Sequence, residues 1–149
     1  MRAVVDSSVL VASLVTVERE AQWARSVVAG HQMAAPEHAL VEASNVLRRM
    51  ELAGTISRLE ATSDFNTLSR MKLELFPFAP FAKRVWELRG NLTCYDAWFA
   101  ALAEGLGCPL FTLDARLARA RGPSCEIITP PSAAPGLPAH QFTTGSNAK

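Results

Sequence analysis

Short apolar segments alternate with helical segments along this chain, and no other feature constrains its fold as strongly. We predict five short strands, at residues 2–5, 32–35, 72–76, 109–112 and 126–128. Helices are predicted between them, at about residues 7–15, 18–29, 37–53, 56–70, 81–89, 93–104 and 115–120. The strands are nearly continuously apolar, as strands covered on both faces should be. The alternation therefore indicates an α/β fold with a mainly parallel central sheet and helices on both of its faces.

The composition favours one folded domain followed by a tail. The chain has 149 residues, of which 49% are hydrophobic and 19% are charged, so it can bury a sizeable core. From Pro130 onward the sequence is dominated by Pro, Gly, Ser, Ala and Thr. We predict a folded domain over residues 1–129 and a Pro/Gly/Ser-rich, disordered tail over residues 130–149.

Charge and cysteine content limit the partners and the compartment. The formal net charge is +1, which excludes a uniformly basic surface for nucleic acid but leaves room for a local patch. The three cysteines are odd in number and widely spaced, which favours reduced thiols over a structural zinc site. No apolar run is long enough to span a membrane, and Asp6 interrupts the N-terminal stretch that resembles a secretory signal. We therefore expect a cytoplasmic protein.

Four acidic residues occupy positions at which a site can form. Asp6 and Asp114 each follow a predicted strand, and ligands of parallel α/β sheets bind beyond the carboxyl ends of the strands. Asp96 and Glu42 lie near the starts of two predicted helices. Taken singly, each has a structural interpretation. Asp6 and Asp114 suit helix N-caps, Asp96 fits a capping box that begins at Thr93, and Glu42 suits a solvated helix flank.

Convergence of these carboxylates would have a chemical consequence. Two unit charges about 4 Å apart repel by about 4 kcal/mol at an effective dielectric constant of about 20. Either some of the groups protonate or a cation lies among them. Carboxylate oxygens without His or Cys select hard ions, Mg²⁺ or Mn²⁺, and water bound to such an ion is a hydrolytic nucleophile. A converging set therefore points to the hydrolysis of phosphodiester bonds.

Four segments carry a resemblance to a known family. They are VVDSSVLVA at residues 4–12, EASNVLRR at 42–49, LRGNLTCYDA with ALAE at 88–104, and TLDARLA at 112–118. In this order they resemble the motifs of PIN-domain ribonucleases and, more narrowly, of the VapC-type toxins of type II toxin–antitoxin pairs. The likeness runs from about residue 1 to residue 129, and its third and fourth motifs are the most specific.

The resemblance implies a PIN-like α/β/α sandwich and an endoribonuclease that depends on Mg²⁺ or Mn²⁺ and hydrolyses RNA with a metal-activated water. It implies a cognate antitoxin that blocks the site, and a homodimer. The quartet that binds the metal and catalyses the reaction is implied to be Asp6, Glu42, Asp96 and Asp114. The family often has a polar or hydroxyl side chain at four further positions beside the quartet. These positions are occupied here by Ser7, Asn45, Thr112 and Arg116.

Three other functions are alternatives to the nuclease. A haloacid-dehalogenase-like phosphatase requires Asp-x-Asp after its first strand, and Ser8 stands at the second Asp position. A receiver domain requires a lysine after a late strand, and Lys72, Lys83 and Lys149 do not follow a suitable one. A PIN fold that binds RNA or protein without cutting is the alternative to an enzyme.

Several arginines are candidates for contacts with RNA phosphates. They are Arg48, Arg49, Arg116, Arg119 and Arg121. Transfer, ribosomal and messenger RNA all stay open as substrates, as do mechanisms with one metal and with two.

Overall fold

The centre of the molecule is a parallel sheet of five short strands. The computed structural model describes residues 1–16 and 19–132. Its strands are β1 (Arg2–Val5), β2 (Gln32–Pro36), β3 (Leu73–Phe76), β4 (Leu110–Phe111) and β5 (Ile127–Ile128). They lie in the order β3-β2-β1-β4-β5, and every neighbouring pair is parallel. The predicted α/β class is confirmed, and the sheet is parallel throughout.

Helices connect these strands as the sequence predicts, with small shifts at their ends. They are α1 (Ser7–Leu14), α2 (Ala21–Gly30), α3 (Ala39–Leu52), α4 (Arg58–Ser69), the 3-10 turn η1 (Ala79–Phe81), α5 (Ala82–Leu88), α6 (Cys94–Leu106) and α7 (Ala115–Arg119). The predicted start of α2 at residue 18 lies outside the described residues. So does the predicted tail from residue 133 onward, and its disorder stays a prediction.

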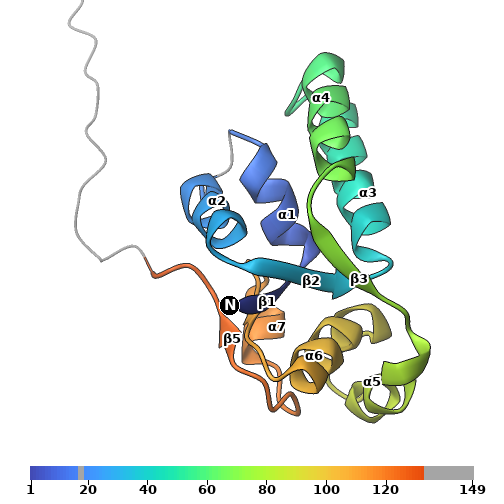
Figure 1. Ribbon diagram of the computed structural model, residues 1–149. Coiled ribbons are helices and arrows are strands. Elements are labelled where there is room, and N and C mark those ends of the chain that lie inside the picture. The colour runs from blue at the N-terminus through green and yellow to red at the C-terminus, as the bar shows by residue number, and fades with distance from the viewer. Residues whose placement is uncertain (17–18, 133–149) are drawn as a thin grey trace, which may run out of the picture.

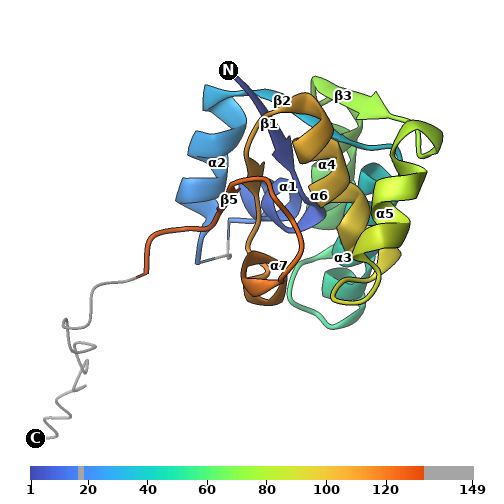
Figure 2. The same cartoon turned by 90° about the horizontal axis from the view of Figure 1, so that it is seen from below.

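The helices form two layers with the sheet between them. Figure 1 shows α1 to α4 on one side of the sheet and α5 and α6 on the other, and Figure 2 shows the same arrangement from below. Helix α1 packs against α2 and α3, whereas α6 packs against α5 and across β1, β2 and β4. The chain is therefore an α/β/α sandwich in which β1 is the central strand.

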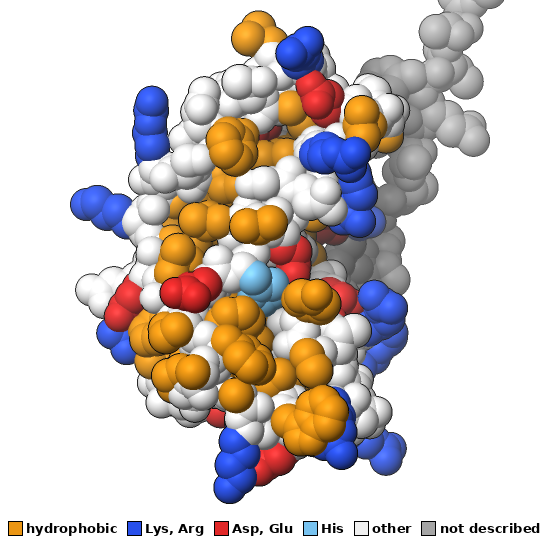
Figure 3. All heavy atoms as spheres, turned by 90° about the vertical axis from the view of Figure 1, so that its right-hand side faces the viewer, with side chains coloured by type: hydrophobic (Ala, Val, Ile, Leu, Met, Phe, Trp, Pro, Cys, Tyr) orange, Lys and Arg blue, Asp and Glu red, His pale blue; other side chains and the backbone are white. Residues whose placement is uncertain are grey.

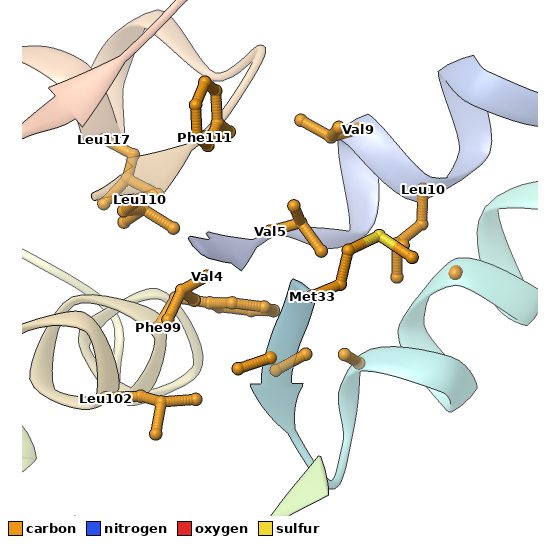
Figure 4. Packing of buried hydrophobic residues seen from close by; sticks show 14 of the residues in the cluster. Val4, Val5, Val9, Leu10, Met33, Phe99, Leu102, Leu110, Phe111 and Leu117 are labelled. Carbon is orange, nitrogen blue, oxygen red and sulfur yellow. The ribbon is translucent and has the colours of Figure 1, made fainter. Parts of the chain in front are cut away.

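Both faces of β1 pack into the hydrophobic core. Val4 and Val5 are fully buried and, as neighbours on a strand, point to opposite faces. In Figure 4, Val4 lies beside Phe99 of α6, and Val5 lies toward Leu10 of α1. Phe99 is the largest of the fully buried side chains. This packing fixes the carboxyl end of β1, where Asp6 begins the connection to α1.

The prediction that the strands are covered on both faces is wrong for the edge strand β3. Its two central residues, Glu74 and Leu75, are exposed. An edge strand has a neighbour on one side only, so its outer residues stay in contact with water. Among the helices that the structure describes, none is long and apolar enough to cross a membrane.

Candidate active site

Asp6 lies at the junction of β1 and α1 and is almost completely buried. It is the N-cap of α1, and its carboxylate accepts a hydrogen bond from the Val9 amide at 3.2 Å. The hydroxyls of Ser8 and Thr112 donate to its two oxygens. Burial raises the pKa of Asp6 to about 6, although these hydrogen bonds act in the opposite direction. Ionised Asp6 therefore carries a net desolvation penalty, which a nearby cation would offset.

Two hydroxyl groups tie the carboxyl ends of β1 and β4 together. The Thr112 hydroxyl donates to Asp6 and accepts a hydrogen bond from the Asp114 amide at 2.9 Å. The Ser8 hydroxyl donates to Asp6 and accepts one from the Leu113 amide at 3.0 Å. Each hydroxyl thus orients Asp6 and also anchors the segment that carries Asp114.

Replacement of Thr112 by valine should lower the free energy of unfolding by about 1–2 kcal/mol. Thr112 is fully buried, and valine has nearly the same shape but leaves Asp6 and the Asp114 amide without this partner. Urea unfolding measures the change. Thr112→Ser keeps the hydroxyl and is the control, because it removes only a methyl group. Equal stabilities of the valine variant and the wild type would contradict the bridging role.

Asp114 reaches the site from the N-terminus of α7. It is the N-cap of that helix, and its carboxylate accepts hydrogen bonds from the amides of Arg116 at 2.8 Å and Leu117 at 3.4 Å. The interpretation of Asp114 as a helix cap is therefore confirmed, and so is that of Asp6. Capping uses one carboxylate oxygen of Asp114, Oδ1, in both contacts.

Asp96 lies in the first turn of α6, beyond the capping residue. Thr93 is the N-cap, and its hydroxyl accepts a hydrogen bond from the Asp96 backbone amide at 3.2 Å. Burial raises the pKa of Asp96, and the charges of Asp114 and Glu42 raise it further. The Asp96 carboxylate therefore lies close enough to Asp114 and Glu42 to be affected by their charges.

Glu42 projects from the first turn of α3 and is half-buried. Its Oε2 atom lies 3.3 Å from Nε2 of His38, although the two are not aligned as in a hydrogen bond. The contact with His38 is the largest cause of the lowered pKa of Glu42, and Ser7 and Arg49 lower it further. Glu42 therefore stays ionised beside carboxylates whose pKa values are raised.

The four carboxylates line one cavity of about 460 Å³ at the carboxyl end of β1. The structure thus brings together Asp6, Glu42, Asp96 and Asp114. Its other lining residues are Ser7, Ser8, Val11, Ala12, Glu20, Val46, Arg49 and Leu113. A larger cavity of about 600 Å³ lies between α2 and residues 130–132, and a single carboxylate lines it. The acidic cavity is therefore the candidate active site despite its smaller size.

The predicted companion residues differ in their placement. Ser7 lines the cavity, and its hydroxyl donates to the Ala39 carbonyl at 3.3 Å. Thr112 contacts Asp6 as described above. Arg116 is largely exposed, with its Nε atom 3.8 Å from Asp114. Asn45 is exposed on α3 and is not among the residues that line the cavity.

Two lining residues, Ser8 and Glu20, are not singled out by the sequence patterns as parts of a site. Glu20 lies in the connection between α1 and α2, at the start of a predicted helix, and no pattern relates it to the other acidic residues. Ser8 could have been predicted from the sequence, because a hydroxyl two residues after an N-cap aspartate lies within reach of the aspartate's carboxylate.

The donor chemistry of the cavity suits a hard divalent cation. Its lining offers carboxylate and hydroxyl oxygens and includes no His or Cys side chain, which is the set that Mg²⁺ and Mn²⁺ prefer. Within residues 1–16 and 19–132, no three His, Cys, Asp or Glu side chains are drawn together closely enough to hold a metal ion. The carboxylates thus fit a metal by their chemistry and surround the cavity without forming a compact centre.

Comparisons with known proteins agree with this architecture. The sequence model of the PIN domain matches residues 3–123. Ribonuclease VapC9 of Mycobacterium tuberculosis is 32% identical over 128 residues, which cover 86% of this chain and 98% of that protein.

Two solved structures share the fold. The M. tuberculosis toxin VapC20, described as cleaving the sarcin–ricin loop, superposes with a TM-score of 0.61 at 16% identity over 78% of this chain and 92% of that chain. VapBC2 from Rickettsia felis, bound to a DNA fragment from its promoter, superposes with a TM-score of 0.61 at 14% identity. The match covers 87% of this chain and 98% of that chain. At these identities the likeness concerns the fold alone.

Proposed function

We infer the function of this chain from its family, since it belongs to the PIN-domain family and, within it, to the VapC-type ribonucleases. We propose that it is a metal-dependent endoribonuclease that acts as the toxin of a toxin–antitoxin pair. The observation that carries the proposal is the meeting of four carboxylates in one cavity at the carboxyl end of the central strand. A helix cap alone would not require Asp96 and Glu42 to face the same cavity as Asp6 and Asp114.

We propose that Asp6, Asp96 and Asp114 hold the cation and that Glu42 completes the site. Mg²⁺ or Mn²⁺ in this position would activate water and offset the charge that builds on the phosphate. The desolvation penalty of ionised Asp6 supports this assignment, because a buried carboxylate without a partner is unfavourable.

The chain's own residues would orient the reacting groups. Ser8 and Thr112 hold both oxygens of Asp6 in fixed directions, so little reorganisation is needed when charge develops nearby. Arg49 lines the cavity, and the exposed Arg116 lies beside Asp114, which also lines it; both arginines suit contacts with the phosphates that flank the cut. In-line attack by water would leave 5′-phosphate and 3′-hydroxyl ends.

The proposed partners are RNA, an antitoxin and a second copy of the chain. The antitoxin is supported by another solved structure of this fold, which is described as a toxin–antitoxin complex from Klebsiella pneumoniae. Exposed hydrophobic side chains support a homodimer, since large apolar patches on soluble proteins mark interaction surfaces. Three of them are Phe78, Trp86 and Tyr95. Figure 3 shows hydrophobic side chains gathered on one face around a histidine and neighbouring acidic groups.

RNA cleavage by the purified protein tests the proposal. Total cellular RNA is incubated with the antitoxin-free protein in Mg²⁺, in Mn²⁺ or in excess EDTA, and the ends of the fragments are mapped. We expect discrete cuts that need the metal and carry 5′-phosphate and 3′-hydroxyl ends. Cuts that persist in EDTA, or that end in cyclic phosphates, would contradict the proposed chemistry. A folded protein that binds RNA but never cuts it would favour the PIN-fold binding module instead.

A further inference from the structure

The imidazole of His38 connects the two helices that carry Glu42 and Asp96. His38 precedes α3, and its Nε2 atom lies 3.3 Å from the Glu42 carboxylate. Its ring stacks on Trp98 of α6, with the ring centroids 4.8 Å apart and the planes 11° from parallel. Trp98 stands two residues after Asp96. One side chain therefore touches a carboxylate of the site and also the helix that supplies another.

The position of the His38 ring is fixed by aromatic contacts. Besides the stack on Trp98, it makes tilted contacts with Tyr95 at 5.7 Å and Phe99 at 5.1 Å between centroids. The His38 side chain is 18% exposed, against 37% for Glu42. Since α3 packs mainly against α4 and α1, and α6 mainly against α5, this ring is a direct link between α3 and α6 at the site.

A purely structural role explains His38 poorly. It stands at the N-cap of α3 but makes no capping hydrogen bond with its side chain. Both ring nitrogens are buried, and neither has a hydrogen-bond partner within the described part of the chain. Burying such nitrogens is unfavourable, and phenylalanine would fill the same stack without that penalty. The contact with Glu42 is the one feature that an apolar ring could not supply.

We propose that His38 is a positioning residue that holds the Glu42 carboxylate in place relative to Asp96 and thereby sets the affinity of the site for its divalent cation. This inference rests on the proposed function, in which Glu42 completes the metal site. Outer groups that orient metal-binding side chains typically contribute 10–100-fold to metal affinity.

Mn²⁺ binding to the full-length protein tests the inference without RNA. Isothermal titration gives the Kd of the wild type, His38→Phe and His38→Gln. His38→Phe keeps an aromatic ring on Trp98 but loses the nitrogen beside Glu42. We expect it to melt at or above the wild-type temperature and to bind Mn²⁺ about 10–100-fold more weakly. His38→Gln restores an N–H group near Glu42 and should recover part of the affinity.

Two further variants separate positioning from general packing. In a Glu42→Gln background, His38→Phe should weaken Mn²⁺ binding no further, because its effect acts through Glu42. His31→Phe is the matched control, since His31 also packs on an aromatic ring, that of Phe111 at 4.9 Å. His31 is not among the residues that line the acidic cavity, so this change should leave the Kd unaltered.

If the wild type binds Mn²⁺, either of two results would overturn the inference. One is equal Mn²⁺ affinity of the wild type and His38→Phe, which would leave the proposed nuclease function intact. The other is a loss in the double variant equal to the sum of the single losses, which would mean that His38 does not act through Glu42. Wild-type protein that binds no Mn²⁺ would contradict both the inference and the proposed metal-dependent function.

Discussion

Replacement of Asp6 by asparagine should stabilise the metal-free protein by about 3 kcal/mol at pH 7 and should abolish its RNA cleavage. Burial raises the pKa of Asp6 from its usual 3.8 to about 6, a difference worth about 3 kcal/mol. Below about pH 4 the group is protonated in both the folded and the unfolded chain. Between about pH 4 and pH 6 the Asp6 carboxyl ionises in the unfolded chain only, so the free energy of unfolding falls as the pH rises. Above about pH 6 the carboxyl is ionised in both states, and the folded chain carries the full penalty.

Urea unfolding in EDTA between about pH 4 and pH 8 measures this effect. The wild type should lose stability across the window relative to Asp6→Asn, and the two curves should meet at the acidic end. The amide can keep the local geometry, because its oxygen can accept from the Val9 amide and its nitrogen can donate to the Thr112 hydroxyl. Mg²⁺ should stabilise the wild type and not the variant. An asparagine variant less stable than the wild type at pH 7 would contradict the prediction, because it would show that the Asp6 carboxylate stabilises the folded state.

The order of strands and helices could be predicted because local patterns decide it. The buried runs of β1 and β2 are bounded by polar residues, and the amphipathic helices have clear starts. The sequence predicts that α6 ends at Glu104, with Gly105 and Gly107 as its stop signals. In the structure Gly105 lies inside the helix, where a Cβ atom would stand 2.9 Å from the Phe81 ring. The helix ends at Gly107, which has a φ of 63° that favours glycine. The sequence alone does not distinguish a glycine kept for packing from one kept for its backbone conformation.

The candidate site could be predicted in part for a similar reason. The carboxyl ends of β1 and β4 lie at the same edge of the sheet, so Asp6 and Asp114 could be placed together before the fold was known. The capping and site interpretations proved compatible, because Asp6 and Asp114 cap helices and also line the cavity. Contacts between distant segments carry no local signal. The bond from Thr112 to Asp6 joins residues 106 positions apart, and its position was matched only through the family resemblance.

The acidic residues of the cavity have opposite pKa shifts because their surroundings differ. Five carboxylates line it, counting Glu20, against one guanidinium, that of Arg49. The contact with His38, together with Ser7 and the charge of Arg49, lowers the pKa of Glu42, whereas burial and neighbouring carboxylates raise those of Asp6 and Asp96. An RNA phosphate would be repelled from such a cavity. A divalent cation would reverse that repulsion, which supports the proposed metal dependence.

Replacement of Asp96 by asparagine should reduce metal-dependent RNA cleavage by on the order of 10²–10³-fold while leaving folding stability nearly unchanged. Burial and the charges of Asp114 and Glu42 raise the pKa of Asp96, so its ionised form does not favour folding. The start of α6 does not depend on this carboxylate either, because the Thr93 hydroxyl accepts its hydrogen bond from the Asp96 backbone. Cleavage rates with excess Mg²⁺, measured beside melting curves, check both parts of the prediction.

Thr93→Ala is the matched control, because it changes the helix start and keeps the carboxylate. Loss of the cap should lower the stability by about 1 kcal/mol and leave the cleavage rate of the folded protein close to that of the wild type. The two variants should therefore have opposite phenotypes, one folded and inactive, the other destabilised and active. Full cleavage by a folded Asp96→Asn protein would remove Asp96 from the proposed site. If Thr93→Ala lost as much activity as Asp96→Asn, the placement of α6 rather than the Asp96 charge would be what the reaction requires.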